Sequence, residues 1–64
     1  MKGPDLIALL MAEGFTVSRR SKTLVWLVRG GEQLLIDSDA EIAEQLAQDI
    51  LARARASGKP PQPP

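Results

Sequence analysis

The chain has 64 residues and contains neither cysteine nor histidine. A chain of this length forms one small domain, which buries only about 60% of the surface that its unfolded form exposes and is therefore marginally stable. Domains of this size gain stability from disulfides, from a structural metal or from oligomerisation. Because disulfides need cysteine, and the usual structural metal ligands are cysteine and histidine, the composition favours oligomerisation.

The charges balance, with eight lysines and arginines against eight aspartates and glutamates. No overall field therefore draws the chain to nucleic acid or to an anionic membrane. No apolar run approaches the roughly 20 residues of a membrane-spanning helix, and the first residues lack the apolar core of a secretory signal. We expect a cytoplasmic protein without a membrane partner.

The first predicted helix begins around Gly3, Pro4 and Asp5, because proline is favoured in the first helical turn and an acidic residue complements the positive end of the helix dipole. Gly14 is predicted to end this helix, since glycine readily takes the left-handed conformation of a helix C-terminus. Apolar residues recur between these ends at helical spacing. They are Leu6, Ile7, Leu10 and Met11, with Leu9 beside them.

Three antiparallel strands are predicted next, over residues 15–19, 23–29 and 32–36. Gly30 and Gly31 form a two-residue hairpin loop between the second and third strands. A three-residue polar turn at 20–22 is predicted between the first two strands, with Phe15 and Val17 facing inward. A two-residue turn would reverse the faces of the first strand.

The glycine loop fixes which residues of the second hairpin share a face. Val25, Leu27 and Ile36 are predicted to face the core. The opposite, outer face is expected to carry Trp26 directly across from Leu35. The predicted outer-face residues are Leu24, Trp26, Val28, Gln33 and Leu35.

A second helix is predicted to begin at Ser38, where Ser38 and Glu41 have the spacing of a capping box. Its predicted apolar stripe consists of Ile42, Leu46 and Ile50, together with Ala43, Ala47 and Ala54. The segment 58–64 contains four prolines and is predicted to be an extended, disordered tail. A role of this tail as a ligand for an aromatic groove in a partner is the alternative.

The predicted fold is therefore an α+β domain over residues 1–57, an α-β-β-β-α chain with a three-stranded antiparallel meander. Two short helices cover one face of such a sheet, so the outer face stays uncovered. A contiguous apolar patch usually marks an interface, and Trp26 is the kind of residue that anchors one. We expect an interaction or regulatory protein that forms a homodimer or binds another protein through this face.

A basic group around the first hairpin turn suggests the alternative function, a dimeric regulator that binds nucleic acid or an acidic partner. Arginine and lysine also guard the edges of sheets, so a solvated hairpin end is the simpler interpretation. The residues considered for this contact are Arg19, Arg20, Lys22 and Arg29, with Lys2 as a further member.

Catalysis has little support in the sequence, because histidine and cysteine supply the usual general base and the strongest nucleophile. Asp37 and Asp39 flank Ser38, but a hard cation needs more oxygen ligands than this segment provides. We therefore expect no enzymatic activity and no cofactor. A small-molecule sensor, with a pocket enclosed by a dimer, is a third possibility without a ligand motif.

The element order over residues 4–56 resembles the small fold of double-stranded-RNA-binding domains. Residues 5–10, Gly14, Phe15 and 17–19 also resemble the opening of HicA-type toxins, in which the first helix ends at a glycine followed by an aromatic residue. That family places its catalytic histidine where this chain has residues 23–25, Thr-Leu-Val, so the resemblance does not imply ribonuclease activity. RNA-binding members of the fold carry lysines at the start of the second helix, where this chain has the acidic residues 37–41.

Overall fold

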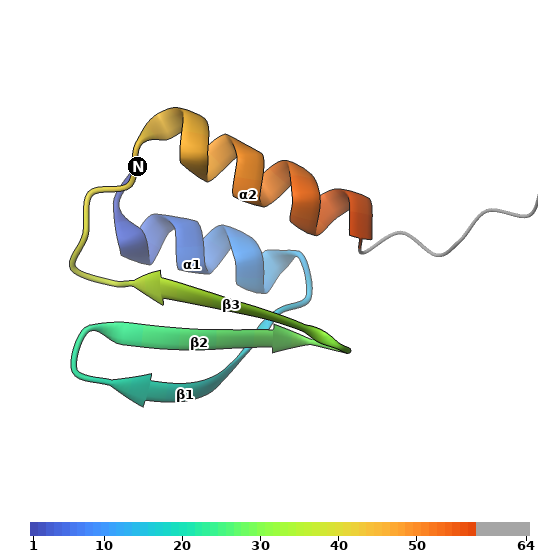
Figure 1. The fold of residues 1–64 in the computed structure, drawn as a ribbon, viewed down its shortest axis with the longest axis horizontal. Helices are drawn as coiled ribbons and strands as arrows, with labels where there is room; N and C mark the ends of the chain where they lie inside the picture. Colours follow the sequence, from blue (N-terminus) through green and yellow to red (C-terminus); the bar gives the residue numbers. More distant parts are fainter. Residues whose placement is uncertain (58–64) are drawn as a thin grey trace, which may run out of the picture.

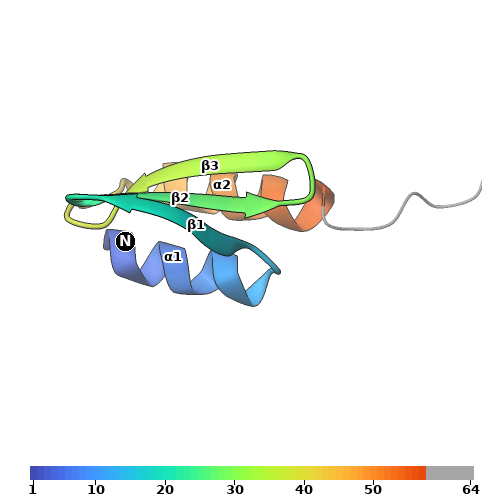
Figure 2. The ribbon, with the colours of Figure 1, turned by 90° about the horizontal axis from the view of Figure 1, so that it is seen from below.

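Residues 1–57, which the computed structural model describes, form a helix, a three-stranded antiparallel sheet in the order β1-β2-β3, and a second helix (Figure 1). The predicted α+β arrangement is confirmed. Both helices lie on the same side of the sheet (Figure 2). The predicted tail at 58–64 lies outside the described residues. The elements are α1 (Gly3–Ala12), β1 (Thr16–Ser21), β2 (Leu24–Arg29), β3 (Glu32–Asp37) and α2 (Glu44–Ser57).

The C-terminus of α1 is closed by the glycine that the sequence predicts. Gly14 has a φ of +105°, and its N–H donates to the carbonyl of Met11 while the N–H of Phe15 donates to the carbonyl of Leu10. This pair of bonds is the Schellman motif, in which an apolar contact usually joins the residues around the cap. Leu10 and Phe15 are both buried, so the cap directs the chain from α1 into the sheet through the core.

The core lies between the inner face of the sheet and the two helices. Val25, Leu27 and Ile36 are buried on the sheet side, as predicted. On α1 the buried apolar stripe is narrower than predicted, because Leu9 and Met11 are exposed. The remaining buried apolar residues are Leu6, Ile7, Leu10, Phe15, Ala47, Leu51 and Ala54.

The second hairpin has the predicted register. Arg29 pairs with Glu32 across the Gly30-Gly31 loop, and Trp26 pairs with Leu35. Gly30 has a φ of +58°, which glycine adopts at little cost and which the primed hairpin turns require. The separation of inner and outer residues on β2 and β3 is therefore confirmed.

The first hairpin differs from the prediction. Its loop has two residues, because Ser21 pairs with Leu24, and β1 extends to Ser21 rather than ending at residue 19. A two-residue loop alone would turn Val17 outward, but the register shifts between Val17 and Arg19. This β-bulge adds one residue to β1. Val17 consequently pairs with Leu27 and packs against the core, so its predicted face is right although the predicted turn is wrong.

The capping-box prediction is also wrong, since α2 begins at Glu44. The Ser38 hydroxyl donates to the carbonyl of Thr23 (2.8 Å), and the Ser38 N–H donates to the same oxygen (2.7 Å). Ser38 thus extends the β2–β3 pairing beyond the sheet and is not available as a helix cap. The N–H of Ile42 donates to the carbonyl of Met1 (2.7 Å), which keeps the residues before α2 extended beside the N-terminal segment.

The later start of α2 goes with a different buried stripe. Ala47, Leu51 and Ala54 are buried, Ile50 is partly buried, and Leu46 is 54% exposed. The predicted stripe missed Leu51 and wrongly included Leu46. No helix within residues 1–57 is long and apolar enough to cross a membrane.

Candidate interaction surface

The outer face of the sheet is a regular array centred on β2. Cross-strand pairing places one residue of β1 and one of β3 beside each outward residue of β2. Trp26 therefore lies at the middle of the array, flanked on both sides. The three rows are Ser21, Leu24 and Asp37; Arg19, Trp26 and Leu35; and Thr16, Val28 and Gln33.

The structure brings the five predicted outer-face residues together on this array, away from both helices (Figure 2). Leu35 is 52% exposed and Gln33 is exposed, whereas Leu24, Trp26 and Val28 are each partly exposed. The patch is better covered at its centre than the sequence suggests, because neighbouring strands shield β2. Its most exposed apolar side chain is Leu35 rather than Trp26.

Arg19 provides part of this shielding. Its guanidinium carbon lies 5.2 Å from the centroid of the Trp26 ring, which is within the range of a cation–π contact. The two-residue loop of the first hairpin causes this pairing, because counting back from the Ser21–Leu24 pair places Arg19 directly beside Trp26. The outer face therefore combines an aromatic ring with a cation, an arrangement that the sequence prediction missed.

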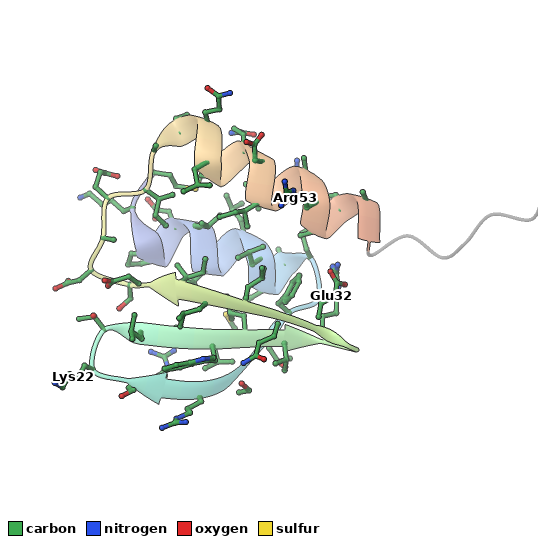
Figure 3. All side chains as sticks on the ribbon, in the orientation of Figure 1. Lys22, Glu32 and Arg53 are labelled. Atoms are coloured by element: carbon green, nitrogen blue, oxygen red, sulfur yellow. The ribbon has the colours of Figure 1, made fainter. Side chains whose placement is uncertain are left out.

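The basic group predicted around the first hairpin turn does not form one surface. Lys22 lies in the hairpin loop with a φ of +56°, at the opposite end of the sheet from Glu32 (Figure 3). Arg19 pairs with the outward Trp26, whereas Arg20 pairs with the inward Val25. Adjacent to the loop, Ser38 is held to Thr23 by two hydrogen bonds, and this brings the acidic segment 37–41 next to the same end of the sheet.

Arg29, which was predicted with this basic group, lies apart from its other members and holds parts of the fold together. It lies at the other end of β2, with a side chain that is 17% exposed. Its guanidinium donates to the carbonyls of Glu13 (2.7 Å) and Ala54 (2.6 Å) and to Oε1 of Glu32 (3.0 Å). It also lies over the ring of Phe15, 4.3 Å from the centroid. Arg29 therefore joins both helix C-termini to the hairpin, and its contact with nucleic acid stays a prediction.

A small depression of about 300 Å³ lies at the N-terminal end of α1, lined by Lys2, Pro4 and residues 38–41. The Glu41 carboxylate lies 3.2 Å from the N-terminal ammonium and raises the pKa of that ammonium above its ordinary value. Lys2 belongs to this mixed-charge site and forms a backbone bridge with Glu41. No cluster of acidic residues within residues 1–57 is arranged to hold a metal ion.

Comparison with known proteins identifies no relative of this chain. No family model matches the chain, and no curated protein or solved structure is significantly similar to it.

Proposed function

We propose that the chain is a non-enzymatic interaction protein that binds a protein partner, or a second copy of itself, through the outer face of its sheet. The observation that carries this proposal is the row formed by Arg19, Trp26 and Leu35, on a face that neither helix covers. Tryptophan and arginine are the residue types whose loss most often costs an interface its affinity. The partner surface that fits this row is apolar, with an acidic group opposite Arg19.

The size of the face bounds the strength of such a contact. Three strands about 4.8 Å apart, with three outward positions along each, cover roughly 300 Å². A stable protein interface takes about 800 Å² from each partner. The outer face alone therefore supports a weak or transient contact, and a tight complex requires additional surface.

Site-specific photo-cross-linking tests the proposal. Benzoylphenylalanine in place of Thr16 lies at an exposed position in the outer array, and the same group in place of Ala52 is an exposed control on α2. We expect a protein adduct from position 16 and much less from position 52, in extract of the source organism. Trp26→Thr, which places another residue of high strand propensity at this position, should remove the adduct. Equal adducts from both positions, or adducts that persist in Trp26→Thr, would contradict the proposal.

The same experiment distinguishes binding of nucleic acid from binding of a protein. Binding through Arg19, Arg20 and Lys22 would yield a nuclease-sensitive adduct, and its amount would fall steeply as salt rises. The divergence of Arg19 and Arg20 onto opposite faces, together with the acidic segment beside Lys22, gives this alternative less support. An adduct of twice the 6.9 kDa chain mass would identify a second copy as the partner.

A further inference from the structure

The edge of β3 that faces away from β2 carries unpaired backbone groups. In an antiparallel ladder, alternate residues point their N–H and C=O groups toward one neighbour or the other. The N–H of Ser38 donates to the carbonyl of Thr23, which shows that the backbone N–H and C=O groups of Ser38 point toward β2. By alternation, those of Leu34 and Ile36 point toward β2 as well. The backbone N–H and C=O groups of Gln33 and Leu35 therefore point outward, where nothing within residues 1–57 pairs with them.

The two edges of the sheet are protected unequally. Natural edge strands avoid unwanted pairing through bulges, prolines and lysine or arginine side chains. On β1 a bulge interrupts the edge and Arg19 and Arg20 follow it. On β3 the pairing is regular from Glu32 to Asp37, without bulge, proline or basic residue. The β3 edge is thus the one at which a further strand can add.

An apolar flank of α2 accompanies this edge. Leu46 and Ile50 are one helical turn apart, and Arg53 continues the same flank. The other flank carries Arg55, which contacts Glu13 at the C-terminal cap of α1, so the Leu46 flank is turned away from α1. In Figures 1 and 2, α2 lies on the β3 side of α1 and runs antiparallel to β3.

Exposed apolar side chains border the edge on both sides. Leu46 (54% exposed) and Leu35 (52% exposed) are the two most exposed large apolar residues within residues 1–57. Leu35 belongs to the outer face of β3 and Leu46 to the helix side. Leu34 and Ile50 are partly buried between them on the inner side. A strand added to β3 would cover apolar surface on both of its faces.

We propose that the β3 edge binds an extended peptide segment of a partner protein as a fourth, antiparallel strand. Residues of the peptide opposite Gln33 and Leu35 exchange backbone hydrogen bonds with them, which is the source of affinity in strand addition. Residues opposite Leu34 and Ile36 point toward the Leu46 flank of α2 and are apolar. The residue opposite Asp37 is basic. The ligand is therefore a segment in which a basic residue is followed by apolar residues at alternate positions.

A partner's peptide fits this edge better than a second copy of the chain. Two copies paired β3 to β3 around a two-fold axis would place their helices on the same side of one continuous sheet. Because α2 already lies on the β3 side of α1 (Figures 1 and 2), the α2 helices of both copies would compete for the same space. A peptide strand brings no helix and leaves α2 in place.

A synthetic peptide with the core Lys-Val-Thr-Val-Thr tests the proposal on the full chain. In this register lysine lies opposite Asp37, the valines opposite Ile36 and Leu34, and the threonines opposite Leu35 and Gln33. The amides of Gln33 and Leu35 should exchange rapidly with deuterium in the free chain, whereas those of Leu34 and Ile36 are protected. Saturating peptide should protect Gln33 and Leu35 as well.

Two backbone-methylated peptides with identical side chains provide the matched control. Methylation of the first threonine removes an N–H that points to Leu35, and binding should weaken about tenfold or more, the loss expected for about 1.4 kcal/mol. Methylation of the first valine removes an N–H that points to solvent, and binding should change little. Equal effects of the two methylations, or no protection at millimolar peptide, would overturn the proposal.

Two further outcomes separate this inference from the function proposed for the outer face. If the free chain sediments at twice 6.9 kDa and the Gln33 and Leu35 amides are already protected, a second copy occupies the edge and the inference is wrong. Trp26→Thr should abolish the outer-face cross-link while leaving peptide binding within about twofold, since the backbone of β3 makes the edge hydrogen bonds and the Trp26 ring contacts Arg19 of β1. Loss of only one of the two activities then identifies which proposal fails.

Discussion

Arg29 is expected to contribute more to stability than any other charged residue of this domain. Its guanidinium bonds the carbonyls of Glu13 and Ala54, near the C-termini of α1 and α2. Hydrogen bonds that involve a charged group contribute about 1.5–3 kcal/mol each, and a cation at a helix C-terminus gains a further few tenths. Since the side chain is 17% exposed, water can partly replace it. We therefore expect Arg29→Met to cost about 2–4 kcal/mol.

The size of this loss matters because the whole domain is small. Marginal stabilities of about 0.05–0.15 kcal/mol per residue give roughly 3–9 kcal/mol for such a chain. Arg29→Met should therefore shift the urea midpoint far toward zero, with an unchanged m value. Trp26 fluorescence reports the transition. Arg29→Lys keeps the charge but not the planar fork that bonds several acceptors at once, so it should lose about half as much.

Arg20→Met is the matched control, because Arg20 is exposed on β1 and its removal should cost less than about 0.5 kcal/mol. A loss in Arg29→Met no larger than in Arg20→Met would refute the reasoning. The same conclusion would follow if Arg29→Lys were indistinguishable from the unmodified chain. Either result would mean that water satisfies the helix carbonyls as well as the guanidinium does.

Three other substitutions test separate parts of the structure by the same urea titration. Gly3→Ala should destabilise by about 2 kcal/mol or more, because its Cβ would collide with the backbone carbonyl of Asp37; a neutral effect would mean that α1 and β3 do not approach as described. Lys22→Gly should stabilise by about 1 kcal/mol, since Lys22 has a φ of +56°; a loss of stability would show that the lysine makes a compensating contact. Leu51→Ala should cost about 2–4 kcal/mol and Leu46→Ala less than about 0.5 kcal/mol; the reverse order would restore the stripe predicted from the sequence.

The second hairpin was predictable because local chemistry determines it. A two-residue loop at Gly30 and Gly31 leaves one register for β2 and β3, and that register fixes every side-chain face. The first hairpin lacks such a signal. Lys22 has no special preference for the positive φ that it adopts, and a bulge has no sequence mark of its own. Its position follows from burying Val17 and Phe15 in the same core, which is a tertiary requirement.

The start of α2 was predicted wrongly for a similar reason. Ser38 and Glu41 have the local pattern of a capping box, but the carbonyl of Thr23 offers Ser38 a partner 15 residues away. The residues that follow pair with the N-terminal segment instead, through Met1 and Ile42. The spacing of a capping box describes only contacts between residues close in sequence. It therefore predicted a helix where a long-range contact holds an extended segment.

The first hairpin also explains which part of the candidate surface escaped prediction. The outer positions on β2 and β3 follow from alternation alone, so Trp26 and Leu35 were found. Arg19 pairs with Trp26 because the first hairpin loop has two residues rather than the predicted three. The bulge beyond Arg19 then keeps Val17 in the core and interrupts the β1 edge. The shorter loop thus adds a cation beside Trp26, whereas the inserted residue completes the core and leaves β3 as the edge at which another strand can pair.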